Sequence, residues 1–222
     1  MREVIKRNWK SMLLSAVIIL FPMAVGVYFW DRLPEQVATH WDFSGNANGW
    51  TSRSFTVYGI PLVMLALHMF CLLISEGDMN SYGQNPKLKR LMYWVIPAVS
   101  LILCASVYPY ALGMDIPMQR MAMLFLGVMF VIIGNYLPKC RQNYWMGIKI
   151  PTTFASEENW NATHRFAGKV YVIVGVLALI CACIQTEMVA NAMLVVIIAA
   201  CALPMGYSYW YGSKNRNKEN KE

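Results

Sequence analysis

Six long apolar stretches, separated by short polar segments, dominate the pattern of this 222-residue sequence. Most of them contain about 20 mostly apolar residues, the length that an α-helix needs to cross a lipid bilayer. The fifth is shorter, and Ala167 and Gly168 extend it at its start. The pattern therefore predicts an all-α fold, a polytopic membrane helical bundle with six transmembrane helices. The predicted spans are Ser11–Trp30, Phe55–Ser75, Leu91–Leu112, Met118–Leu137, Val170–Ile184 and Met188–Tyr209.

The basic residues between these stretches predict which side of the membrane each polar segment faces. Of the 19 Lys and Arg residues, sixteen lie in the two tails and in the second and fourth connections, and three lie in the first and third connections. Lys and Arg accumulate on the cytoplasmic side of membrane proteins, so we expect both termini in the cytoplasm. The expected organisation is a cytoplasmic tail (1–10), two spans with an extracellular loop at 31–54 (11–75), spans three and four (76–137), a cytoplasmic loop (138–169), spans five and six (170–209) and a basic cytoplasmic tail (210–222).

The composition argues against a soluble protein and against binding to nucleic acid. Hydrophobic residues make up 57% of the chain and charged residues 14%, whereas soluble domains contain about 25% charged residues. The net charge of +7 comes from basic residues in the tails and connections, so membrane topology explains it. Five of the six Cys residues lie inside apolar stretches, and Cys140 lies between Lys139 and Arg141. The sequence contains no CxxC motif. We therefore expect no disulfide framework and no cofactor.

The extracellular loop is too polar to lie in the membrane and too long for a simple turn. Gln36–Phe43 alternates weakly and contains β-branched and aromatic residues, which indicates a short strand. Ser44–Gly49 is rich in Gly and Asn, which is typical of a turn. The aromatic residues around it are either a membrane-interface belt or part of a surface that binds a peptide or another amphipathic ligand. The candidate ligand-binding residues are His40, Trp41, Asp42, Gly45, Gly49 and Trp50.

The cytoplasmic loop divides into an irregular part, rich in Pro, Gly and aromatic residues, and a second part with a helical pattern. Ser156 is a suitable N-cap, and Glu157 and Glu158 follow in the first turn, where the helix dipole favours acidic residues. Trp160 and His164 are four residues apart and therefore share a helix face. We expect this helix either to lie along the inner membrane surface or to lead straight into the fifth span.

Two motifs in these loops resemble a known protein family. LPEQVATHWDFSGNANGW is similar to a small domain of unknown function, with a Pro, a His-Trp pair, a Gly and a Gly-Trp pair, that often opens such proteins. GNYLPKCRQNYWMGIKIPTTFASEENWNATHRFAGK is similar to the signature of the SdpI family of bacterial membrane proteins. The family favours Arg where this chain has Lys149, which lacks the bidentate geometry of Arg, and Trp-Thr where it has Thr152-Thr153. The matching positions are Gly134, Asn135, Pro138, Asn143, Gly147, Ile148, Pro151, Trp160, Thr163, His164 and Gly168.

The resemblance implies protection of the producing cell against a small membrane-active peptide. The family is named for immunity to a secreted killing peptide, and in the named system the protein also holds a soluble repressor at the membrane. The expected partners are therefore a secreted peptide toxin, a cytoplasmic transcriptional repressor and membrane lipids, with the chain in the bacterial cytoplasmic membrane. The resemblance also points to a cytoplasmic partner-binding motif formed by Asn135, Asn143, Gly147, Lys149, Pro151, Trp160, Thr163 and His164.

A membrane channel or transporter and a lipid-modifying enzyme are the alternatives. Coupled transporters usually carry ionisable residues inside their spans, but no Asp, Glu, Lys or Arg lies in the middle of a predicted span. We expect His68, Ser15, Ser100 and Asn135 to form hydrogen bonds between helices. The chain has no HExxH or GxSxG motif, and its three His residues are scattered, so no catalytic residue and no metal site are expected. The remaining enzymatic alternative acts on lipid head groups through Asn143, Lys149 and His164.

Overall fold

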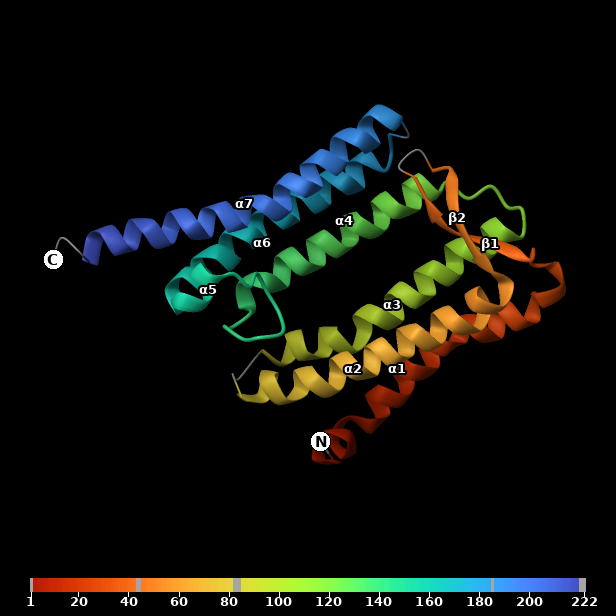
Figure 1. Cartoon of the computed structure of the whole chain (residues 1–222), viewed down its shortest axis with the longest axis horizontal. Coiled ribbons are helices and arrows are strands. Elements are labelled where there is room, and N and C mark those ends of the chain that lie inside the picture. Colours follow the sequence, from red (N-terminus) through yellow and green to blue (C-terminus); the bar gives the residue numbers. More distant parts are fainter. Residues whose placement is uncertain (1, 43–44, 82–84, 185, 220–222) are drawn as a thin grey trace. The chain divides into compact units, whose positions relative to one another are not determined.

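Helices make up most of the computed structural model, which describes residues 2–42, 45–81, 85–184 and 186–219. Six helices in this part of the chain are long and apolar enough to cross a membrane, which confirms the predicted all-α membrane bundle. Short 3-10 or π turns occupy Trp30–Arg32, Phe55–Gly59 and Leu137–Lys139. The main elements are α1 (Arg2–Tyr28), β1 (Gln36–Trp41), β2 (Ala47–Ser52), α2 (Ile60–Ser81), α3 (Pro86–Ala111), α4 (Met118–Tyr136), α5 (Pro151–Ala155), α6 (Glu157–Cys181) and α7 (Glu187–Glu219) (Figure 1).

The chain divides into two compact units. The first unit comprises Met1–Gly77 and Lys89–Met118, and the second comprises Asp78–Leu88 and Gln119–Glu222. Helix α1, the β-hairpin, most of α2 and nearly all of α3 therefore belong to the first unit, whereas α5, α6, α7 and nearly all of α4 belong to the second. The hairpin and the loop motif at 138–169 consequently lie in different units.

In the first unit, the hairpin follows the end of α1 and precedes the start of α2 (Figure 1). The guanidinium group of Arg53 donates hydrogen bonds to the backbone carbonyls of Trp30 (2.8 Å) and Leu33 (3.0 Å), and it lies 4.7 Å from the centre of the Trp30 ring. Leu33 packs with Val57 and Tyr108 in a buried cluster. Because hydrogen bonds from a charged donor are strong, these contacts fasten the base of the hairpin to the helices.

The hairpin itself confirms one local prediction and corrects another. Strand β1 is the predicted strand, although it ends at Trp41, and Phe43 and Ser44 lie outside the described residues. The turn predicted over Ser44–Gly49 is wrong in its second half, because Ala47–Ser52 forms strand β2, antiparallel to β1. Backbone hydrogen bonds to β1 hold Asn and Gly in an extended conformation that their intrinsic preferences disfavour.

Polar side chains join the helices of the first unit as predicted. The Ser15 hydroxyl donates to the carbonyl of Met12 (2.9 Å), so it accepts the hydrogen bond from His68 Nε2 (2.8 Å). The Ser100 hydroxyl donates to the carbonyl of Ile19 (3.1 Å). All three polar side chains are buried, and the bonds of His68 and Ser100 join α2 and α3 to α1, as hydrogen bonds between membrane helices commonly do.

In the second unit, helices α4 and α6 approach each other so closely that their backbones touch. A Cβ atom added at Gly168 would lie 2.7 Å from the carbonyl oxygen of Gly134, and one added at Gly175 would lie 2.7 Å from that of Gly127. Both glycine pairs are seven residues apart on each antiparallel helix. Small residues at helix contacts are typical of membrane bundles, which gives two glycines of the sequence motif a structural reason.

Helix α6 settles the alternative that the sequence leaves open. It runs without a break from Glu157 to Cys181, so the helix that starts in the loop at 138–169 leads straight into the fifth span. The hydroxyl of Ser156 accepts a hydrogen bond from the backbone N–H of Asn159 (3.3 Å), which confirms the predicted N-cap. Helix α7 packs along α6 and continues to Glu219, beyond the predicted end of the last span.

Candidate functional site

The outward face of the hairpin carries His40 and Trp50. His40 pairs with Gly49 across the strands, and its Nδ1 donates to the side-chain oxygen of Asn48 (2.5 Å). Trp50 follows two residues after Asn48 and therefore points to the same face of β2. The exposed fraction of the Trp50 side chain is 55%, which is high for a residue of this size. The hairpin thus exposes both an aromatic ring and an imidazole whose orientation is fixed by a hydrogen bond.

The inward face of the hairpin packs on the first unit. Trp41 meets Tyr110 of α3 edge to face, with ring centres 5.3 Å apart and planes at 87°. Its Nε1–H is buried and has no hydrogen-bond partner among the described residues. The two tryptophans predicted to bind a ligand therefore have different roles. Trp41 anchors the hairpin to α3, whereas Trp50 is exposed and available to a ligand.

The other three predicted residues of the loop shape the hairpin. The carboxylate of Asp42 accepts a hydrogen bond from the backbone N–H of Asn46 (2.8 Å), which closes the turn. Gly45 adopts a φ of 86°, in the left-handed region that favours glycine. A Cβ atom at Gly49 would lie 2.9 Å from the Cβ atom of His40, so glycine permits close pairing there.

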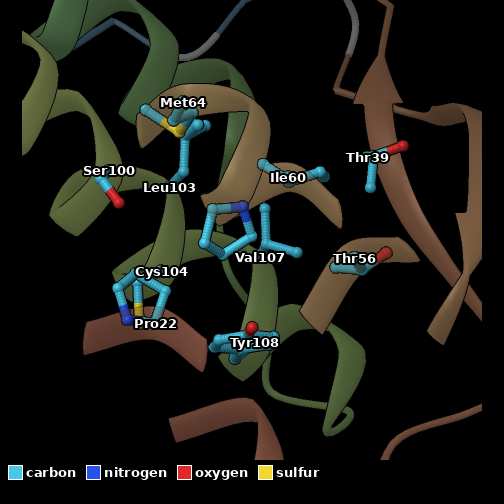
Figure 2. Close-up of a pocket in the computed structure, with 11 residues that line it drawn as sticks. Pro22, Thr39, Thr56, Ile60, Met64, Ser100, Leu103, Cys104, Val107 and Tyr108 are labelled. Atoms are coloured by element: carbon cyan, nitrogen blue, oxygen red, sulfur yellow. The ribbon is translucent and has the colours of Figure 1, made fainter. Parts of the chain in front are cut away.

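A partly open cavity of about 80 Å³ lies inside the first unit, beneath the hairpin (Figure 2). Strand β1 contributes Thr39, the start of the second span contributes Thr56 and Met64, and α3 contributes Ser100 and Cys104. Figure 2 shows Thr39 and Thr56 on one side of the cavity and Ser100 on the opposite side. The cavity was not predicted, because it depends on how α1, α2, α3 and the hairpin pack.

In the second unit, Trp160 and His164 form the centre of a buried cluster. Trp160 is fully buried, its indole N–H donates to the carbonyl of Cys140 (2.8 Å), and its ring stacks on His164 with centres 4.1 Å apart. Nδ1 of His164 lies 2.7 Å from the carbonyl of Trp160, so it carries the proton. Nε2 then accepts the backbone N–H of Ile148 (3.0 Å). These bonds hold the irregular part of the loop against the first two turns of α6.

Gly147 is required by this cluster. Its φ of 108° lies in the region that other residues rarely adopt. A Cβ atom at this position would clash with Nε2 of His164 and would lie 2.9 Å from the Trp160 ring. The glycine therefore lets the backbone pass directly over the stacked pair.

Asn143 organises the turn that precedes Gly147. Its buried side-chain oxygen accepts the backbone N–H groups of Trp145 (2.8 Å) and Met146 (2.7 Å). Its amide N–H donates to the carbonyl of Arg141 (2.7 Å). The predicted motif residue is therefore a structural centre of the loop, since one side chain replaces several backbone hydrogen bonds.

The Cys140 thiol and the His164 imidazole make structural contacts in this loop. Burial raises the pKa of the Cys140 thiol to about 11, although a hydrogen bond from Asn143 acts in the opposite direction. The thiol therefore stays protonated at neutral pH and is a poor nucleophile. Both ring nitrogens of His164 are engaged by the backbone. In the described ranges, no group of three His, Cys, Asp or Glu side chains is arranged to hold a metal ion.

A second buried network joins α5, α6 and α7. The side-chain oxygen of Asn159 accepts from the hydroxyls of Thr163 (2.9 Å) and Ser208 (2.9 Å), and its amide donates to the carbonyl of Ser208 (3.0 Å). The hydroxyls of Thr152 and Ser208 are 2.7 Å apart. Of these residues only Thr163 was a candidate. The spacing of Asn159 and Thr163 on one helix face was a signal, but nothing in the sequence indicates Ser208 as their partner.

Four residues of the predicted partner-binding motif are exposed: Asn135, Gly147, Lys149 and Pro151. Pro151 begins helix α5, and the Lys149 ammonium donates to the carbonyl of Tyr144 (3.1 Å). The side chains of Tyr144 and Trp145 are 63% and 43% exposed. The buried cluster thus supports an aromatic surface with a basic residue beside it.

Known proteins match both parts of the chain. Residues 139–208 match the SdpI/YfhL protein family, and residues 17–65 match a domain of unknown function, DUF1648. The immunity protein SdpI of Bacillus subtilis (strain 168) is 26% identical over 206 residues, which cover 92% of this chain and 97% of the relative. No solved structure matches the chain. With six helices long and apolar enough to cross a membrane, the chain is a multi-pass cell-membrane protein that is similar to the SdpI family at residues 139–208 and to the immunity protein SdpI along nearly its whole length.

Proposed function

We propose that this protein is an integral-membrane immunity protein that binds or neutralises a secreted antimicrobial peptide. Its whole-length similarity to an immunity protein supports this role. The observation that carries the proposal is the exposed pair of His40 and Trp50 on a hairpin fastened by Arg53. A rigid, exposed aromatic side chain binds with little loss of conformational freedom, so it suits recognition of an amphipathic peptide.

The proposed role requires the hairpin to face the outside of the cell. The distribution of Lys and Arg supports this orientation, with the loop at 138–169 and both termini in the cytoplasm. A peptide arriving from outside then meets the hairpin before it reaches the bilayer.

The double variant His40→Ala, Trp50→Ala is expected to lower resistance at least about tenfold, because it removes the exposed aromatic ring and the oriented imidazole. The measurement is the inhibitory concentration of the killing peptide for Bacillus subtilis cells that lack their own immunity protein and express this chain. Trp210→Ala is the matched control, since its side chain is 56% exposed and lies in the other unit. Unchanged resistance of the double variant, at equal amounts in the membrane, would contradict binding at the hairpin.

We also propose that the cytoplasmic loop holds a soluble transcriptional repressor. The exposed side chains of Tyr144 and Trp145 favour this second role, because aromatic residues are enriched at protein interfaces. Trp160 and His164 are buried, so a partner would meet the surface above them and not these side chains.

Tyr144→Ala, Trp145→Ala is expected to release the repressor of the family's named system from the membrane while resistance to the peptide is kept. The fraction of a fluorescent repressor fusion that sediments with membranes should fall at least about fivefold, because the aromatic contact area is lost. Tyr209→Ala, at an exposed position of α7, is the control. An unchanged membrane fraction would exclude this surface as the docking site.

A further inference from the structure

The cavity beneath the hairpin has the placement of a ligand site. All its lining residues belong to the first unit, so its shape does not depend on the second. Because Trp41 of the hairpin packs on Tyr110, the later part of α3 is the end near the hairpin. Ser100 and Tyr108 line the cavity, and eight residues of helix correspond to about 12 Å. The cavity therefore extends from the hairpin to Ser100, which lies near the middle of α3.

Two polar groups of the cavity wall already have hydrogen-bond partners. The Thr56 hydroxyl lies 2.7 Å from the hydroxyl of Thr51, and the Ser100 hydroxyl donates to the carbonyl of Ile19. Most of the remaining wall consists of apolar side chains, including Met64 and Val107. A ligand group that enters here therefore gains mainly apolar contacts.

The volume limits the size of the group that fits. A protein cavity of about 150 Å³ accommodates benzene, and one water molecule occupies about 30 Å³ in the liquid. The cavity in this protein is about 80 Å³, so it is too small for an aromatic ring without rearrangement. Three or four carbon atoms fit, which corresponds to the side chain of valine, leucine or isoleucine.

We infer that this cavity receives one branched aliphatic side chain of the secreted peptide, while Trp50 and His40 contact the peptide from the hairpin. This inference rests on the proposed function and adds a specificity site to it. A lipid is the competing occupant. An acyl chain can reach the same depth, because Ser100 lies near the middle of α3, and the labelling experiment below distinguishes the two occupants. Thr39 of the hairpin lines the cavity, which favours the peptide. A peptide that binds at the hairpin can insert a side chain at that depth.

The native thiol of Cys104 in the cavity wall allows a direct test. A variant that retains only Cys104 is reconstituted into lipid nanodiscs and treated with methyl methanethiosulfonate. Adding the killing peptide is expected to slow the reaction about tenfold, because the inserted side chain covers the sulfur. A peptide in which the inserted residue is changed to alanine should no longer slow it, and a scan of its Val, Leu and Ile residues identifies that position. A variant that retains only the exposed Cys183 is the control, and its rate should not change.

A filled cavity provides the second test. Cys104→Phe adds five side-chain atoms to the cavity and is expected to lower resistance about tenfold, since burying one aliphatic side chain changes affinity by about that factor or more. Cys183→Phe makes the same change at an exposed position and should leave resistance unaltered.

The outcomes separate this inference from the proposed function. If the wild-type chain protects cells but the peptide does not slow labelling of Cys104, the cavity is not the site and the inference is overturned, while immunity stands. If labelling is blocked in lipid but rapid in detergent without peptide, a lipid occupies the cavity, which also overturns the inference. If the wild-type chain gives no protection, the proposed function fails, and the inference fails with it.

Discussion

Trp160→Ala is expected to lower the free energy of unfolding by about 3–5 kcal/mol, the range observed when a buried tryptophan or phenylalanine is truncated. Trp160 has no exposed surface, stacks on His164 and donates to the carbonyl of Cys140. Alanine leaves a cavity under the loop and removes the bond that ties residue 140 to α6. Unfolding of the purified protein in detergent, followed as a function of denaturant, measures the loss.

Trypsin provides a local measurement of the same effect. Arg141 and Lys149 lie in the loop that Trp160 holds, so both peptide bonds should be cleaved faster in Trp160→Ala as the loop detaches. Trp145→Ala removes an exposed tryptophan from the same loop and is expected to change stability by no more than about 0.5 kcal/mol. Equal stability of Trp160→Ala and Trp145→Ala would show that the buried cluster does not hold the loop.

Gly168→Ala and Gly206→Ala are expected to change stability in opposite directions. At Gly168 the new methyl group would lie 2.5 Å from Cγ of Pro138 and 2.7 Å from the carbonyl oxygen of Gly134. The backbone oxygen cannot move aside as a flexible side chain could, so the variant should lose about 1–3 kcal/mol. At Gly206 nothing lies within 4 Å, and alanine should stabilise α7 by up to about 1 kcal/mol through helix propensity.

The midpoint of thermal unfolding in one detergent, compared across the wild type and both glycine variants, tests this pair. Because the chemical change is identical, differences in detergent binding or helix propensity cannot explain opposite signs. A Gly168→Ala variant as stable as Gly206→Ala would mean that α4 and α6 do not pack backbone to backbone.

The sequence predicted the membrane spans well because hydrophobicity over about 20 residues is a strong, local signal. It also predicted the N-cap at Ser156 and the shared face of Trp160 and His164, since both follow from spacing within one helix. Spacing does not reveal what a face meets, and the motif alone could not indicate that this pair is buried under its own loop. Strand β2 was missed because Asn and Gly favour turns until a neighbouring strand supplies hydrogen bonds.

The contacts between residues far apart in the chain could not be predicted from the sequence for a similar reason. Asn159 and Ser208 are 49 residues apart, and each alone is an ordinary polar residue in a helix. The cavity depends on side chains from four elements, none of which is unusual by itself. Patterns along one chain record local preferences, whereas these features arise only when several helices are packed together.

The unbroken course of α6 makes this helix stiff along its whole length. Its 25 residues form a rod of about 37 Å, and neither α6 nor its glycine-paired neighbour α4 contains an internal proline, whereas α1, α3 and α7 do. Two closely packed helices without a proline kink bend little. A tilt of α4 and α6 at one membrane surface is therefore expected to be transmitted to the other surface. Within the second unit, we therefore expect α6 to pass such a tilt along its length to its first two turns, which carry the Trp160 cluster.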